Sequence, residues 1–281
     1  GFAAGEEDEL SSFDVRTFVK EIILILMEEF EMTAIEELYQ CASMAVASAV
    51  EDMETNPNWW KLREAGLLLI GSMVHFTNEE EEDLCFSAEE VFSALCDFDL
   101  HPDAPAFLRG RAIWLTSHLA RFHLGRNEPI HEHLEVCSKN FNVSDPIPVR
   151  YSACVGLHNI FQSVGSVAVV APFASHIVPT CVHLMEADSS EMEVLSTVFE
   201  VLSFALQADP SSGLELAEHV ARLSMKIWHQ HHENDILMTD LWTVVGALLC
   251  LEDKQLQVLE ILHDPIQSVI HSVVHGKGDL G

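Results

Sequence analysis

A pattern of apolar helices that recurs every 41 to 47 residues is the sequence feature that most constrains the fold of this chain. The recurring helix often opens with an aliphatic residue followed by arginine and carries a small or β-branched residue one turn later, as in KLREAGLLLIGSM from Lys61. Six copies align on this inner position, at Val19, Ala65, Ala112, Ala153, Val198 and Val244, with separations of 46, 47, 41, 45 and 46 residues. A regular period of this length indicates a repeat protein with a core that continues from repeat to repeat.

Another helix, the first of each pair, is expected between consecutive copies of the recurring helix, which is the second of each pair. Phe173, Ile177, Cys181 and Leu184, for example, follow one another at steps of four, four and three residues, which is the spacing of one face of an α-helix. Each repeat is therefore an antiparallel helix pair, and the period is that of HEAT-type repeats. We predict an all-α fold, an α-solenoid (superhelix) of about six such pairs, in which the second helices begin near residues 14, 59, 107, 147, 191 and 239.

The ends of the helices and the ends of the chain give further expectations. Residues 1–11 have the composition of a flexible acidic N-terminal remnant, and the chain, which starts with Gly1, is expected to be an excised segment whose solenoid covers residues 12–281. Residues 78–83 are expected to form an acidic loop between two helices. Asp14, Asp145 and Asp240 are placed to cap helix N-termini, and the alanines at the inner position predict close approach of neighbouring helix axes.

The charge balance narrows the possible partners. The 281 residues contain 14 Lys plus Arg and 45 Asp plus Glu, which gives a formal net charge of -31. This is the reverse of a nucleic-acid-binding surface, and it repels anionic membranes while attracting basic proteins. The longest apolar stretch, from Val164 to Val178, is interrupted by Pro172 and His176, so we expect no membrane insertion. Basic proteins are the predicted partners.

Residues typical of catalysis, cofactors or metals do not form a recognisable pattern. The sequence contains no GxSxG elbow, phosphate-binding glycine loop or HExxH helix. The seven cysteines include no CxxC pair, which favours buried thiols in a reducing compartment. His229, His231 and His232 are grouped, but without a flanking cysteine they are more typical of an exposed loop than of a metal site. We expect no enzyme activity, no cofactor and no metal.

Three consecutive copies of the repeat carry a resemblance to a known family. Trp59-Trp60-Lys61-Leu62-Arg63-Glu64-Ala65, followed by a helix end at Gly71, resembles a helix of importin-β-type nuclear import receptors. Phe107-Leu108-Arg109-Gly110-Arg111-Ala112 with Trp114, and then Val149-Arg150 with Ala153, resemble the next two repeats of these receptors. The order and spacing look most like the importin-9 branch, and the resemblance runs roughly from Ser12 to Val274.

The resemblance implies a central segment of a curved receptor whose second helices line a cargo surface. It implies basic cargo such as histones and ribosomal proteins, release by the Ran GTPase, contact with nucleoporins through the full-length receptor, and shuttling between cytoplasm and nucleus. The N-terminal domain by which such receptors contact Ran has no counterpart in these residues, so Ran binding is not assigned to them.

Candidate cargo-binding residues lie at the starts of the second helices and in the acidic loop. They are Trp59, Trp60, Glu64, Asp145, Glu191, Glu193 and Asp240, together with Glu79, Glu80, Glu81, Glu82 and Asp83. Tryptophan beside carboxylates can bind the stems and charges of Lys and Arg. The alternatives are that the loop is simply solvated, that one tryptophan belongs to the core, and that Asp145 and Asp240 only cap helices.

Two other functions fit a helical-repeat chain. One is a HEAT-repeat scaffold of a multiprotein assembly unrelated to nuclear import, and the other is a structural spacer in a large kinase-like solenoid. The sequence upstream and downstream would distinguish them, since a receptor carries an importin N-terminal domain and a kinase-like protein carries a kinase domain.

Overall fold

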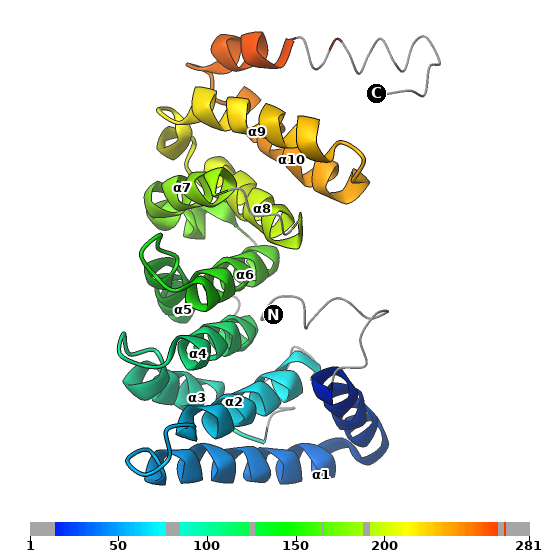
Figure 1. Ribbon diagram of the computed structural model, residues 1–281, viewed down its shortest axis with the longest axis vertical. Coiled ribbons are helices and arrows are strands. Elements are labelled where there is room, and N and C mark those ends of the chain that lie inside the picture. The colour runs from blue at the N-terminus through cyan, green and yellow to red at the C-terminus, as the bar shows by residue number, and fades with distance from the viewer. Residues whose placement is uncertain are drawn as a thin grey trace. The chain divides into compact units, whose positions relative to one another are not determined.

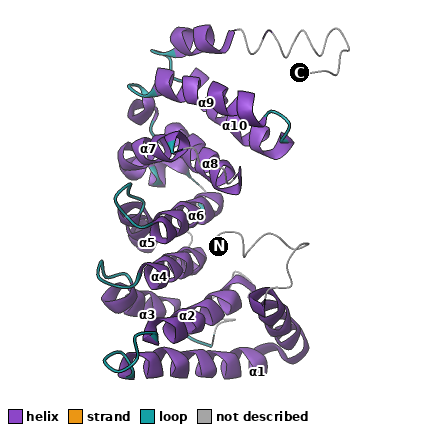
Figure 2. Cartoon of the chain, viewed as in Figure 1, coloured by secondary structure: helices purple, strands orange, loops and turns teal. Residues whose placement is uncertain are grey.

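The computed structural model describes residues 15–76, 85–123, 127–164, 166–187, 192–263 and 267. Figure 2 shows these residues as helices joined by loops, with no strand among them. The helices are α1 (Val15–Glu51), α2 (Trp59–Phe76), α3 (Ala88–Ala94), η2 (Leu95–Asp99), α4 (Ala106–Leu119), η3 (Ala120–His123), α5 (Asn127–Asn140), α6 (Ile147–Ser163), η4 (Val167–Val169), α7 (Ala171–Glu186), α8 (Met192–Ala208), η5 (Pro210–Gly213), α9 (Ala217–His231) and α10 (Asp235–Leu249). A last described helix covers 255–263.

The chain divides into two compact units, unit 1 (Gly1–Ser163) and unit 2 (Val164–Gly281). In unit 1, α2 packs against α1 and α4, α4 also packs against α6, and α5 packs against α4 and α6. In unit 2, α8 packs against α7 and α10, and α10 packs against α9. Each unit is thus a row of helix pairs in which neighbours in sequence are neighbours in space (Figure 1). The prediction of an all-α solenoid is confirmed.

Second helices of the repeats begin close to turns rich in Pro, Asp and Asn. α2 begins at Trp59, α4 at Ala106, α6 at Ile147 and α8 at Met192. These starts lie within one residue of the expected starts near 59, 107, 147 and 191. The last second helix, α10, begins at Asp235 instead of near 239, because Asn234 is its N-cap and accepts a hydrogen bond from the Leu237 amide at 3.0 Å. Asp240 therefore lies inside α10, and its predicted role as a cap is wrong.

Helix α1 contains a sharp bend. Its one non-helical residue is Glu31, with φ 46° and ψ -132°. The surrounding segment EEFEMTAIEEL has neither Gly nor Pro, so a glutamate takes up the left-handed conformation that glycine adopts most easily. The bend divides α1 into residues 15–30 and 32–51.

Replacing Glu31 with glycine is expected to raise the free energy of unfolding by about 0.5–1 kcal/mol, because glycine removes the Cβ strain of the positive φ. The exposed Glu37 lies in regular helix on the same element, so Glu37→Gly is the control and should lower stability by about 0.5–1 kcal/mol. Urea unfolding followed by circular dichroism measures both. A loss of stability in Glu31→Gly equal to that in Glu37→Gly would show that α1 is straight in solution.

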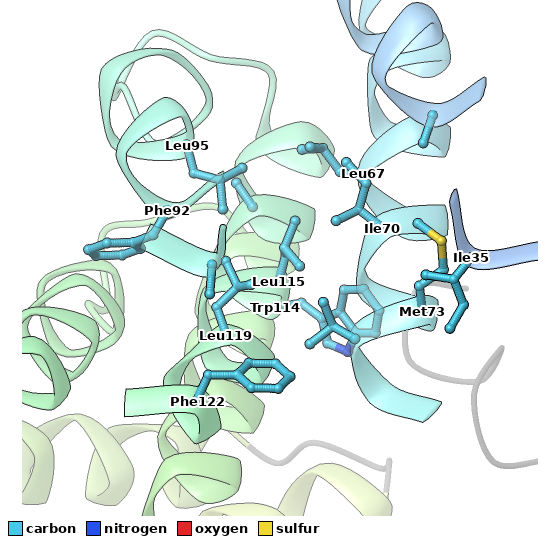
Figure 3. Close-up of a cluster of buried hydrophobic side chains, with 14 of the residues drawn as sticks. Ile35, Leu67, Ile70, Met73, Phe92, Leu95, Trp114, Leu115, Leu119 and Phe122 are labelled. Carbon is cyan, nitrogen blue, oxygen red and sulfur yellow. The ribbon is translucent and has the colours of Figure 1, made fainter. Parts of the chain in front are cut away.

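A continuous apolar cluster runs from α1 through α2 to α4 and η3 in unit 1. Figure 3 shows Leu67, Ile70 and Met73 of α2 facing Trp114, Leu115 and Leu119 of α4. Of the aligned inner positions in the two units, Ala112, Ala153, Val198 and Val244 are fully buried. The other two differ from the prediction, because Ala65 is exposed and Val19 is 45% exposed.

Close packing of α2 on α4 depends on Gly71. The resemblance placed this glycine at a helix end, but it lies inside α2, where a Cβ added to it would stand 2.1 Å from the Trp114 ring. The residue is therefore needed for close approach of a ring and not for a turn.

The cysteines provide a chemical test of the packing. Cys137 and Cys154 are buried, and burial raises the pKa of Cys137 to about 12 and that of Cys154 also well above its ordinary value. Cys41 and Cys250 are exposed. Because the thiolate is the reactive form, a thiol reagent at mildly alkaline pH should label Cys41 and Cys250 and leave Cys137 and Cys154 unlabelled, as read by peptide mass spectrometry. In urea all four should react, whereas labelling of native Cys137 as fast as Cys250 would contradict this packing.

Candidate functional site

Part of the predicted cargo surface lies outside the described residues. Glu79, Glu80, Glu81, Glu82, Asp83 and Glu191 are outside them, and so is the side chain of Glu193. The roles of these residues remain predictions. The other candidates, Trp59, Trp60, Glu64, Asp145 and Asp240, can be placed.

Glu64 belongs to the interior and is not available to a cargo. Only 4% of the residue is exposed. Its Oε1 accepts a hydrogen bond of 3.0 Å from Nε of the equally buried Arg111, whose guanidinium lies 4.7 Å from the centre of the Trp114 ring. A buried charge needs such a partner, so Glu64 joins α2 to α4. Its assignment as a cargo contact is corrected on this ground.

Asp145 also has a partner within the chain, and the same pairing occurs one repeat earlier. The Arg109 guanidinium donates to the Asp145 carboxylate, and the Arg63 guanidinium donates to Asp99 at 2.5 and 2.8 Å. Both pairs join residues 36 positions apart. In both repeats, the arginine that follows an aliphatic residue near the start of a second helix thus pairs with a carboxylate at or next to the turn that precedes the second helix of the following repeat. No helix amide donates to Asp145 among the described contacts, so its predicted role as a cap is replaced by an ion pair.

The environment of Asp99 shows two opposing effects on its carboxyl. Burial raises the pKa of Asp99 above its ordinary value, while the hydrogen bond and charge of Arg63 lower it. Arg63 also donates to the Val46 carbonyl at 3.1 Å and lies 4.4 Å from the centre of the Phe98 ring. This arginine therefore holds α1, α2 and η2 together.

Asp240 is half-buried and bonded within unit 2. Its Oδ2 accepts a hydrogen bond from the Ser196 hydroxyl, which joins α10 to α8. Like Asp145, it lies at a contact between helices of successive repeats. Neither carboxylate is free of partners inside the chain.

The two tryptophans at the start of α2 are half-buried against aromatic neighbours. The Trp59 ring meets Phe98 edge-on at 5.9 Å between centroids, and the Trp60 ring stacks on Phe107 at 6.1 Å. Lys61 Nζ lies 5.6 Å from the centre of the Trp60 ring. The Trp60 ring therefore already has the ammonium group of Lys61 near it. Binding of a cargo cation by Trp60 remains a prediction.

Apolar side chains at the helix starts were missed by the sequence analysis. Phe107 is 45% exposed and Ile147 is 72% exposed in unit 1, and Met192 is 44% exposed and Ile236 is 75% exposed in unit 2. We call these four the helix-start residues. Their common signal is an apolar residue within one or two positions of the first residue of a second helix, where no preceding turn of helix covers it.

The turns that precede four of the second helices are acidic. They cover residues 52–58, 100–105, 141–146 and 232–234 and contain Asp52, Glu54, Asp103, Asp145 and Glu233. None of these four turns contains lysine or arginine. Exposed apolar side chains beside turns that contain carboxylates but no lysine or arginine suit a partner that carries both Lys or Arg and apolar groups.

The described helices and side chains also bear on other kinds of site. No described helix combines the length and apolar character needed to cross a membrane. Among the described side chains, no three of His, Cys, Asp and Glu gather in an arrangement that could hold a metal ion. Near the grouped histidines, Trp228 instead contacts the rings of His229 and His232, at 4.9 and 6.1 Å between centroids.

Comparison with known proteins supports the importin-β resemblance at a coarse level. No protein-family model matches the chain. Importin-9 of Drosophila melanogaster is 22% identical over 256 residues, which cover 88% of this chain and 24% of that protein. The chain thus spans about a quarter of the length of this relative. Together with the helical repeats, the similarity supports a relationship to the importin-β family of nuclear transport receptors.

Proposed function

We propose that this chain is a segment of a nuclear transport receptor that binds basic protein cargo, such as histones or ribosomal proteins, for Ran-dependent import into the nucleus. The observation that carries the proposal is the combination of a net charge of -31 with acidic turns and exposed apolar side chains at the starts of the second helices. The similarity to importin-9 agrees with it.

The proposed mechanism is summed electrostatics along successive repeats. A single exposed ion pair contributes only about 0.2–1 kcal/mol, so useful affinity requires many contacts spread over several repeats. Helical-repeat chains suit this task because each repeat presents the same edge to an extended partner. The chain acts by binding alone, without catalysis or a cofactor, while Ran and nucleoporins act through the full-length receptor as it moves between cytoplasm and nucleus.

Binding of the purified chain to a core histone dimer across a salt series tests this function. We expect a Kd of about 1 μM or tighter at about 50 mM salt, weakening by about tenfold or more by about 300 mM, because salt screens exposed charges. An acidic protein of similar size is the control and should not bind. Absence of histone binding at low salt, or binding that salt does not change, would contradict the proposal and favour the assembly scaffold.

A further inference from the structure

A surface cleft in unit 2 lies where α8 and α10 begin. Its volume is about 590 Å³, and it is lined by residues of the α9–α10 turn together with Met192 at the start of α8. The turn that joins α9 to α10 can be followed in Figure 1. The volume falls in the range of sites that hold an organic group, so the cleft can admit side chains of a partner.

The walls of the cleft are fixed by one asparagine. Asn234 Oδ1 accepts the hydrogen bond from the Leu237 amide that caps α10, and its Nδ2 contacts Met192 Sδ at 3.3 Å. The amide thereby holds the turn against the start of α8. These contacts connect the start of α10 with the start of α8 at the cleft.

Two of the residues that line the cleft are anionic. Glu233 and Asp235 line it, and neither carboxylate has a hydrogen bond or ion pair to another described side chain. No lysine or arginine is among the lining residues. His231 is also part of the lining.

The apolar lining complements the charges. Ile236 is 75% exposed and Met192 is 44% exposed, and both line the cleft. Lysine and arginine carry a cationic head on an aliphatic stem, so a site for them needs carboxylates for the head and apolar surface for the stem. This cleft provides both, with the carboxylates of residues 233 and 235 close to the apolar side chains of residue 236 and of one residue of α8.

We infer that the cleft binds a lysine or arginine side chain, together with an adjacent apolar side chain, of an extended basic segment of a protein partner. This inference rests on the proposed function, because it assigns one contact point for the basic cargo. The inferred contact is one defined site, in contrast to binding spread over the whole acidic surface.

The test uses the whole 281-residue chain and two probes, a core histone dimer and a short fluorescent peptide in which lysines flank one leucine. The double variant Glu233→Gln/Asp235→Asn removes the two carboxylates of the cleft. Its matched control is Glu252→Gln/Asp253→Asn, which removes the same charge from exposed residues that do not line the cleft. We expect peptide affinity to fall about fivefold in the cleft variant and less than about twofold in the control.

A third variant separates apolar from charged contacts. Ile236→Ser leaves the charge unchanged and should weaken binding of the leucine-containing peptide more than binding of an all-lysine peptide. Thermal unfolding of every variant checks that the fold is retained, since Asp235 lies in the first turn of α10.

Each outcome bears on the cleft site, on the proposed function, or on both. An equal loss of peptide affinity in the cleft and control variants would overturn the cleft site and leave the proposed function standing. The same holds if the wild-type chain binds the histone dimer but not the peptide. Binding of neither probe at low salt would overturn the proposed function and the cleft site together.

Discussion

Replacing Arg63 with alanine should lower the free energy of unfolding by about 3–5 kcal/mol, the usual cost of leaving one half of a buried ion pair without its partner. Arg63 is 6% exposed and Asp99 is 1% exposed. The variant removes both hydrogen bonds to Asp99, the bond to the Val46 carbonyl and the contact with the Phe98 ring. Urea unfolding followed by circular dichroism measures the change.

Two further variants separate the ion pair from general effects of mutation. Lys61 is exposed in the same helix, so Lys61→Ala should change stability by less than about 0.5 kcal/mol. The double variant Arg63→Met/Asp99→Leu removes both charges and should be more stable than Arg63→Ala, because no uncompensated charge stays buried. A loss below about 1 kcal/mol in Arg63→Ala would contradict the burial of this pair.

Replacing Gly71 with alanine should lower the free energy of unfolding by about 1–3 kcal/mol, the typical cost of overfilling a packed core. The new methyl group would stand 2.1 and 2.6 Å from two carbons of the Trp114 ring. The ring or the α2–α4 spacing must therefore shift. Helix propensity alone predicts the opposite sign, since alanine is favoured over glycine inside a helix by about 1 kcal/mol.

Gly246 is the matched control, because it also lies inside a helix and an added Cβ meets nothing within 4 Å. Gly246→Ala should raise stability by about 0.5–1 kcal/mol. Opposite signs for the two substitutions, measured by the same urea titration, would support the contact between Gly71 and Trp114. A gain in Gly71→Ala similar to that in Gly246→Ala would contradict it.

The repeat period was sufficient to predict the fold class. Helix type and order follow from apolar spacing, which is a local property of the sequence. Individual burial was less predictable, as Ala65 shows. Ala65 aligns with Ala112 and Ala153, yet in α2 the neighbouring Gly66 faces α1, where its added Cβ would meet Val46 at 2.7 Å. A shift of one residue turns a helix by about 100°, and a repeat alignment does not fix such a shift.

The candidate site was predicted less completely than the fold. Glu64, Asp145 and Asp240 were chosen as acidic residues near helix starts, but each has a partner inside the chain. Those partners lie 36 to 47 residues away, a separation that becomes a contact only through the stacking of repeats. The exposed Ile147 and Ile236 were missed for the related reason that their apolar character fits the buried stripe equally well.

Hydrogen exchange of the whole chain, free and bound to a core histone dimer at low salt, tests the central claim most directly. The claim is that the acidic turns and helix-start residues form the binding surface for a basic partner. We predict slower exchange in the turns before α2, α4, α6 and α10 and at the starts of these helices and of α8, with α5, α7 and α9 changed much less. Protection confined to α5, α7 and α9, or exchange that the histone dimer leaves unchanged, would contradict the account.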